Sequence, residues 1–289
     1  MLNNLSGQQR QPFVTGARKP SAERLSQISL SQTRSRTGEA FMRRLAAVQE
    51  EALAGSVNYI SQLPVIKNQG ERGACVAFAL TGINEFFFQR KTGVSVDLSE
   101  QYLFFETKQF EGGNACSSLL SDAAGVVAGK GQCTEEIWSY NPNLPCIQIS
   151  GKPANADSSA LQFKNTYMSI PKSNDLIVQL KKTLVMGQLI AFTLPVYRSW
   201  KNDGVASTGR IPMPDNGEVP EMQDGAEDGH ALMIVGYQDD PEEAGGGLFI
   251  VRNSWGPVWG ANSFHGSGYG TIPYEFISRE SWEVYAGPV

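Results

Sequence analysis

Histidine and cysteine are scarce in this sequence, with only two histidines and four cysteines among 289 residues. The cysteines are scattered and show no spacing typical of a metal site. The sequence also lacks a glycine-rich phosphate-binding motif. We therefore expect neither a metal ion nor an organic cofactor.

Long apolar runs are missing as well. No stretch of about 18 apolar residues predicts a transmembrane helix, and the polar N-terminus lacks the apolar core of a conventional secretory signal. The net charge of −5 argues against general nucleic-acid binding. We expect neither membrane nor nucleic-acid partners, and a cytoplasmic protein by default, with export by a non-classical route as the alternative.

Charge is unevenly distributed along the chain. Residues 1–55 carry eight Arg or Lys against four Glu, a balance of +4, so the other residues carry −9. Residues 1–37 are rich in Ser, Gln and Arg, a composition typical of disorder, and 37–54 has the apolar spacing of a helix. We expect 1–55 to be a basic, propeptide-like or gating segment, or else a tail with a docking helix, in front of one domain over 56–289.

The most informative segment places Cys75 between a glycine-rich turn and an apolar run. Gly70 and Gly73 interrupt regular structure, so a helix should begin close to Cys75. Backbone N–H groups and the helix dipole at that end favour a thiolate and lower its pKa. A buried cysteine is more often inert packing, so other residues must decide between packing and nucleophilic chemistry.

Three further residues favour the chemistry. Gln69 precedes the thiol by a spacing that lets its amide donate to the oxygen reached by the Cys75 N–H. His230 opens an apolar strand pattern, and Asn253 ends another. Cysteine, histidine and asparagine can serve as attacker, proton acceptor and orienter of the imidazole. If Cys75 is the nucleophile, three cysteines remain, Cys116, Cys133 and Cys146. At most one disulfide can form among these three.

Taken together, these motifs resemble the papain family of cysteine peptidases, particularly its bacterial members. The Gln-x5-Cys spacing, the His-Ala start of a strand, the Asn-Ser-Trp-Gly box and a Leu-Ser-Glu-Gln segment at 98–101 occur in the family's order. The resemblance implies a cysteine endopeptidase, a hydrolase that is often made as a zymogen. It assigns catalysis to Cys75, His230, Asn253 and Gln69.

The resemblance also implies an α+β fold of two lobes with the active site between them. Residues 56–150 would form the mainly helical lobe, whose central helix carries Cys75. Residues 151–289 would form an antiparallel, barrel-like lobe that carries His230 and Asn253. The order of patterns agrees, because predicted helices at 100–107, 119–128 and 174–186 precede or accompany predicted strands at 189–196, 231–237, 248–251 and 268–272.

Substrate binding is less well specified. The resemblance implies that Trp255 shields the His230–Asn253 contact, that Gly229 lines the cleft, and that Gly113 and Asn114 lie near the family's substrate-binding edge. The family's Cys-Gly-Ser-Cys-Trp sequence is absent, since Arg72 replaces its first cysteine and Val76 its tryptophan. Subsite preference stays open, with Tyr274, Glu275 and Phe276 as candidates for the base of the main pocket.

Two other functions remain open on the sequence. The same residues would support thiol acyl transfer or deamidation, and the scaffold could serve as a catalytically silent interaction protein with the basic tail as its binding arm. For the peptidase we expect a monomer that takes a peptide or protein substrate in the interlobe cleft, with its own N-terminal segment near that cleft.

Overall fold

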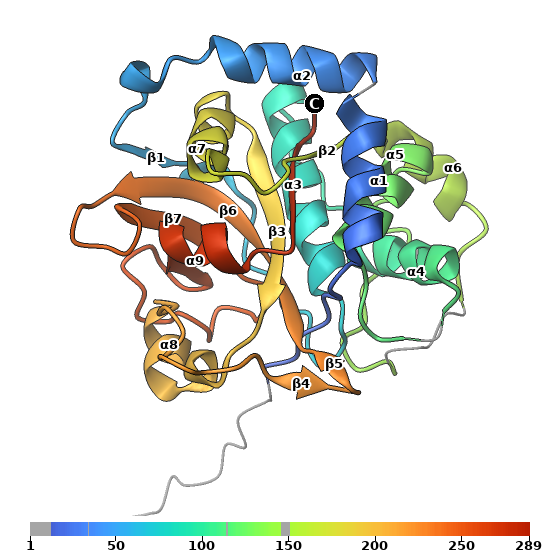
Figure 1. The fold of residues 1–289 in the computed structure, drawn as a ribbon. Coiled ribbons are helices and arrows are strands. Elements are labelled where there is room, and N and C mark those ends of the chain that lie inside the picture. The colour runs from blue at the N-terminus through green and yellow to red at the C-terminus, as the bar shows by residue number, and fades with distance from the viewer. Residues whose placement is uncertain (1–12, 34, 114, 146–150) are drawn as a thin grey trace, which may run out of the picture.

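A computed structural model describes residues 13–33, 35–113, 115–145 and 151–289. Helices and strands follow one another in a mixed order, with most of the helices first (Figure 1). The described α-helices are α1 (Ala22–Thr33), α2 (Arg36–Ala47), α3 (Cys75–Thr92), α4 (Glu100–Glu111), α5 (Leu120–Gly129), α6 (Ala156–Ala160), α7 (Leu176–Val185), α8 (Asp203–Thr208) and α9 (Tyr274–Glu280). The described 3₁₀ helices are η1 (Glu50–Ala52), η2 (Ile60–Gln62), η3 (Leu161–Phe163) and η4 (Arg198–Lys201).

The strands belong to two antiparallel sheets. They are β1 (Ser56–Asn58), β2 (Met168–Ser169), β3 (Leu189–Pro195), β4 (Met222–Gln223), β5 (Ala226–Glu227), β6 (Gly229–Asp239), β7 (Gly247–Arg252), β8 (Tyr269–Pro273) and β9 (Glu283–Gly287). The larger sheet has the order β2-β9-β3-β6-β7-β8, with β1 also paired to β6, and β4 and β5 form a separate hairpin. In the described part the larger sheet ends at β2 and β8 and does not close into a barrel.

Helix α3 is the central element of the fold. It begins at Cys75 and ends at Thr92, and the C-cap residue Gly93 has a left-handed φ of 74° that would be strained with a Cβ. Every residue from Cys75 to Phe86 is buried, which fits a helix that is apolar nearly all round. The helix packs against β3 and β6 on one side and α4 and α5 on the other.

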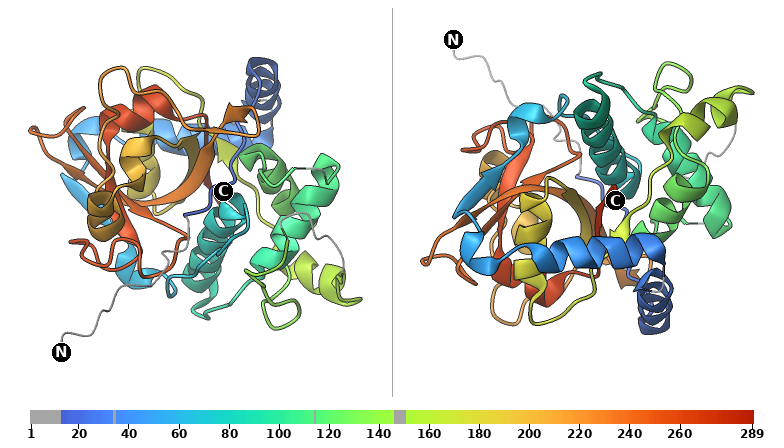
Figure 2. Two further views of the ribbon diagram at one scale, coloured as in Figure 1. Left: turned by 90° about the horizontal axis from the view of Figure 1, so that it is seen from below. Right: turned by 90° about the horizontal axis from the view of Figure 1, so that it is seen from above.

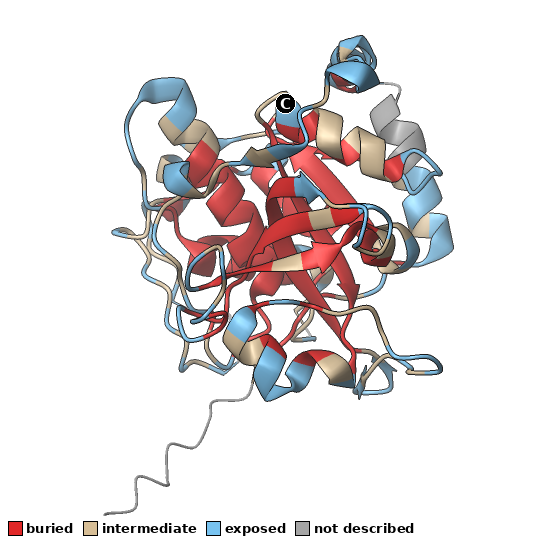
Figure 3. Cartoon of the chain, turned by 90° about the vertical axis from the view of Figure 1, so that its left-hand side faces the viewer, coloured by how far each residue is buried: buried red, intermediate tan, exposed pale blue. Residues whose placement is uncertain are grey.

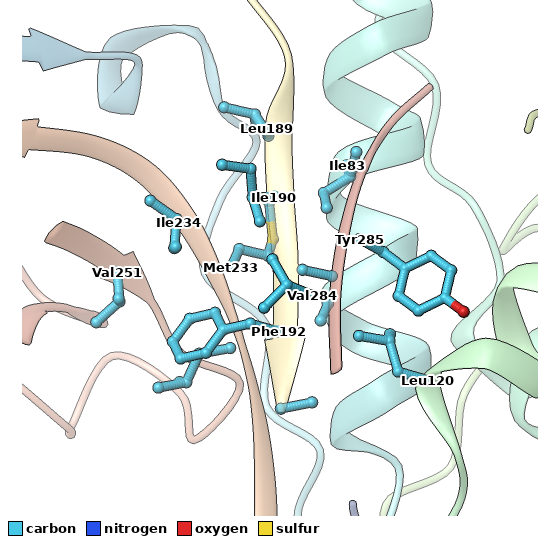
Figure 4. Close-up of a cluster of buried hydrophobic side chains, with 14 of the residues drawn as sticks. Ile83, Leu120, Leu189, Ile190, Phe192, Met233, Ile234, Val251, Val284 and Tyr285 are labelled. Carbon is cyan, nitrogen blue, oxygen red and sulfur yellow. The ribbon is translucent and has the colours of Figure 1, made fainter. Parts of the chain in front are cut away.

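The core where sheet and helices meet is continuous. Ile83 of α3, Leu120 of α5 and Val284 of β9 lie in one cluster with residues of β3 and β6 (Figure 4). Buried residues run through α3 and the sheet, and exposed residues gather on the outer helices and loops (Figure 3). This core fixes α3 against β6, so that the first residues of both elements are held side by side.

The secondary structure differs from the sequence predictions in several places. Residues 22–33, expected to be disordered, form α1, which is tied to the body by an ion pair of 2.5 Å between Arg24 and Asp122. The helix predicted over 37–54 ends at Ala47, because the chain turns extended at Val48. Strand β9 was not predicted, since all five of its residues are buried and no alternation marks it.

Candidate active site

Cys75 is the first residue of α3 and is completely buried. Its position at the helix N-terminus agrees with the sequence prediction. The backbone N–H of Ala231, the residue after His230, interacts with its sulfur, which places the thiol against the start of β6. Cys75 and Cys133 are free thiols, whereas Cys116 is disulfide-bonded. Cys146 lies outside the described residues.

His230 and Asn253 form the expected pair. The Nε2 of His230 lies 2.8 Å from the Oδ1 of Asn253, and both side chains are buried. The backbone N–H of Ser254 also donates to this Oδ1 at 2.7 Å, which identifies the oxygen end of the amide. The imidazole Nε2 therefore carries the proton. Its Nδ1 is buried with no hydrogen-bond partner in the described part of the chain.

Gln69 is held in a fixed orientation by its neighbours. Its Oε1 accepts a hydrogen bond of 2.5 Å from the Ser254 hydroxyl, and its backbone N–H donates to the Ser254 carbonyl at 2.8 Å. The Nε2 is then the donor end of the amide, and one of its hydrogen bonds, of 2.8 Å, goes to the Arg72 carbonyl. Sequence reasoning predicted Gln69 but missed Ser254, which stands next to Asn253 in the predicted box.

An N-terminal segment occupies this site. We call residues 13–19 the arm. The arm passes between the lower end of α3 and the β4–β5 hairpin before it rises into α1 (Figure 1), and the views from above and below place it between the helices and the large sheet (Figure 2). The sequence predicted a gating segment somewhere within 1–55, and no pattern singled out these residues.

The arm begins on the aromatic wall of the site. The ring of Phe13 stacks on Trp255 at 4.7 Å between centroids, and Trp255 in turn stacks on His230 at 4.3 Å. The carbonyl oxygen of Val14 accepts hydrogen bonds from Gln69 Nε2 at 3.0 Å and from Trp255 Nε1 at 2.7 Å. A peptide carbonyl thus lies at the donor that the sequence assigned to an oxyanion.

Backbone pairing holds the middle of the arm on both walls. The N–H groups of Gly16 and Ala17 donate to the Gly229 carbonyl at 3.0 and 2.9 Å. On the opposite wall the Ser118 N–H donates to the Gly16 carbonyl, and the Arg18 N–H donates to the Ser118 carbonyl, each at 2.8 Å. Gly229 therefore contacts the arm directly through its carbonyl oxygen.

Side chains anchor the rest of the arm. The Thr15 hydroxyl donates to the carboxylate of Asp228, which is buried beside the site. Lys19 donates to both oxygens of Glu227 at 2.9 Å. Arg18 donates to Glu111 at 3.0 Å, at the end of α4. The basic charge predicted for this region is thus paired with acidic residues of the cleft.

One cavity beside the arm bears on the predicted substrate-binding edge. A cavity of about 540 Å³ beside the arm is lined by residues 115–117 and by the 223–229 segment. Gly113 is not among the described residues that line this cavity or contact the arm, and Asn114 lies outside the described residues. Tyr274 and Phe276 are buried in the core, and Glu275 pairs with Arg279 at 3.1 Å, so the structure favours none of the three as a pocket base.

Burial determines the electrostatics of the site. It raises the pKa of the Cys75 thiol to about 12, a shift that the Ala231 N–H opposes. Burial likewise lowers the pKa of His230 to about 4, against the Asn253 hydrogen bond, which raises it. With the arm in place both groups are neutral at pH 7. The prediction of a lowered thiol pKa was therefore wrong for this state, because desolvation outweighs the helix N-terminus.

The described residues contain no group of three potential ligands that could hold a metal ion. None of the helices in this part of the chain is both long and apolar enough to span a bilayer. The arrangement is that of a thiol, an imidazole, an amide orienter and an amide donor around a bound peptide segment. Such a site defines a thiol-dependent acyl-transfer enzyme.

Comparison with known proteins identifies the class more closely. The sequence profile described as "Papain family cysteine protease" matches residues 56–272, so this chain belongs to the papain family. The chain is 25% identical over 224 residues to an uncharacterised peptidase C1-like protein of Acanthamoeba polyphaga mimivirus, covering 74% of this chain and 66% of that protein. It is 30% identical over 203 residues to procathepsin L of Felis catus, covering 69% and 55%. The chain thus spans about half to two thirds of these curated relatives.

Among solved structures, xylellain, a cysteine protease from Xylella fastidiosa, superposes with a TM-score of 0.71 at 23% identity, covering 95% of this chain and 96% of that one. A digestive procathepsin L 3 of Tenebrio molitor superposes with a TM-score of 0.61 at 17% identity, covering 92% and 98%. These likenesses confirm the predicted two-lobe α+β fold of the papain type.

Proposed function

We propose that this chain is a cysteine endopeptidase that is held latent by its own arm. The observation that carries the proposal is the hydrogen bond from Gln69 Nε2 to the Val14 carbonyl. This hydrogen bond brings a peptide carbonyl of the arm to Gln69, the proposed oxyanion donor, and so supports the proposal. Membership of the papain family supports the same activity.

The proposed cycle is that of acyl transfer by a thiol. When the arm leaves, the Nδ1 of His230 accepts the Cys75 proton, and the sulfur forms a bond to the carbonyl carbon of the substrate. The carbonyl oxygen becomes an anion that Gln69 Nε2 and the Cys75 N–H stabilise. His230 returns its proton to the leaving amine as the peptide bond breaks. Water then attacks the thioester with His230 as base, which releases a carboxylic acid and restores the thiol.

The other residues position this machinery. Asn253 accepts from Nε2 and keeps Nδ1 free for the thiol proton. Trp255 covers the imidazole with its ring. In the latent state the arm also keeps Cys75 and His230 dry and neutral, so no thiolate attacks the bound arm itself. Latency therefore rests on both occupancy and desolvation.

Labelling with the thiol-directed epoxide E-64 tests the proposal. The full chain and a chain without residues 1–19 are incubated with the reagent, and mass spectrometry locates the adduct. We expect rapid labelling of Cys75 only in the shorter chain, with Cys75→Ala as the control for labelling elsewhere. No adduct on Cys75 in either chain would exclude the peptidase. Product analysis with an added amine then separates hydrolysis from acyl transfer.

A further inference from the structure

A small cavity lies beside Asn253, and no residue of the arm is among those that line it. Its volume is about 20 Å³, which is enough for a single water molecule. Helices α3 and α4 and strands β6 and β7 surround it. Lys67, Glu85, Asn253 and Ser254 are among the residues that line it.

Two polar atoms on the residues that line this cavity have no hydrogen-bond partner in the described part of the chain. They are the Nδ2 of Asn253 and the Oε2 of Glu85. Both residues are almost fully buried, at 4% and 3% exposure. A buried polar group without a partner costs about 1–3 kcal/mol. One hydrogen-bonding molecule in the cavity could satisfy both atoms at once.

The rest of each group is already fixed. Glu85 Oε1 accepts from Lys67 Nζ and from the Leu98 N–H, each at 2.9 Å. Asn253 Oδ1 accepts from His230 and from the Ser254 N–H. Neither group can turn to satisfy its remaining atom without giving up these bonds. One atom of each is therefore left for the cavity, one of them a donor and the other an acceptor.

We propose that a water molecule binds in this cavity, accepting from Asn253 Nδ2 and donating to Glu85 Oε2, and that Glu85 is thereby a positioning residue for Asn253. The proposal rests on the proposed function only in giving Asn253 its role toward His230. The ligand must be uncharged and must offer one hydrogen-bond acceptor and one donor. A water molecule meets these needs and fits the available volume.

The consequence concerns the tautomer of His230. Through the bound water, the Glu85 carboxylate favours the orientation in which the Asn253 N–H end points toward the cavity. In that orientation the oxygen end of the amide faces the imidazole. If the amide turned over, its N–H would face Nε2 and the ring proton would move to Nδ1. Nδ1 could then no longer accept the Cys75 proton. Glu85 and the Ser254 N–H act together against that turn.

Two measurements on the full chain test the inference, and neither depends on catalysis. The first is a crystal structure at a resolution that shows ordered waters. We expect a water within hydrogen-bond distance of Asn253 Nδ2 and Glu85 Oε2. A dry cavity overturns the proposal, whether or not the chain proves to be a peptidase.

The second measurement is the ¹⁵N spectrum of labelled histidine in the variant Glu85→Gln. Only His230 and His265 contribute, so assignment is direct. Gln keeps the volume and the Oε1 contacts but turns the cavity-facing acceptor into a donor. We expect the Nδ1–H fraction of His230 to rise roughly tenfold, because the change removes about one hydrogen bond from the favoured amide orientation.

The matched control is Glu106→Gln. Glu106 is a buried carboxylate at 1% exposure, paired with Lys130 and Lys152, and it does not line the cavity. It should leave the His230 tautomer unchanged. An unchanged tautomer in Glu85→Gln, or an equal change in both variants, overturns the positioning role. If Glu85→Gln does not fold, the crystal structure alone decides whether the water is bound.

Discussion

The indole Nε1 of Trp255 and the side-chain Nε2 of Gln69 donate to one oxygen, the carbonyl of Val14. The two donors come from segments far apart in sequence, and the acceptor comes from a third. This oxygen links the arm to the predicted oxyanion donor and to the aromatic wall of the site. Release of the arm therefore frees the groups that a substrate needs.

A substitution that sterically displaces the arm from the cleft should activate the protein. A Cβ at Gly16 would lie 2.3 Å from the Gly73 carbonyl oxygen, so Gly16→Ala forces the arm away from α3. We expect E-64 to label Cys75 at least about tenfold faster in this variant, the equivalent of about 1.4 kcal/mol. Gly55→Ala is the control, because a Cβ there meets nothing within 4 Å. Equal rates in both variants would contradict a blocking arm.

The oxyanion role of Gln69 can be measured once the arm is loosened. In the Gly16→Ala background, Gln69→Ala should lower kcat by about 10²–10³, because one donor to the developing oxyanion is lost. Substrate binding should change much less. Gln62→Ala, an exposed position in η2, serves as the control. A loss confined to KM would assign Gln69 to substrate binding instead.

Acid should open the site. His230 has a pKa of about 4 when buried, against an ordinary value of 6.5. The closed state holds His230 neutral, so His230 stabilises the closed state relative to the open one. This stabilisation is fully present above pH 6.5 and is lost as the pH falls toward 4. Between pH 8 and pH 5 the open fraction should rise about thirtyfold.

Hydrogen exchange of residues 13–19, corrected for the intrinsic effect of pH, measures this opening. The variant His230→Gln lacks the titrating group and should lose the dependence. If His230→Gln keeps the same pH profile, another group controls the arm.

The ion pair between Lys19 and Glu227 should contribute modestly to latency. Both side chains are partly exposed, at 52% and 32%, and such pairs are worth about 0.2–1 kcal/mol. Lys19→Glu or Glu227→Lys alone should raise the E-64 labelling rate by a factor of about two to five. The double exchange should restore the slow rate, which a double-mutant cycle would detect. Additive effects would mean that the pair does not form in solution.

The sequence located the segments that carry the candidate reactive groups and the longer helices and strands of the described part. Glycines before an apolar run placed Cys75 at a helix start, and apolar patterns found the strands that carry His230 and Asn253 to within a few residues. These features are local, since they depend on spacing along one element. The same local signals could not find α1 or β9, because each exists only by packing on distant parts of the chain.

What the sequence by itself determined is the set of reactive groups: a thiol at a helix start, an imidazole at a strand start, and amides in the two flanking motifs. Only the tertiary structure decided their state. Cys75 and His230 are fully buried in the fold, and this desolvation makes both groups neutral where the helix end alone would favour a thiolate. Burial depends on which segments meet in space, and spacing along the chain carries no measure of it.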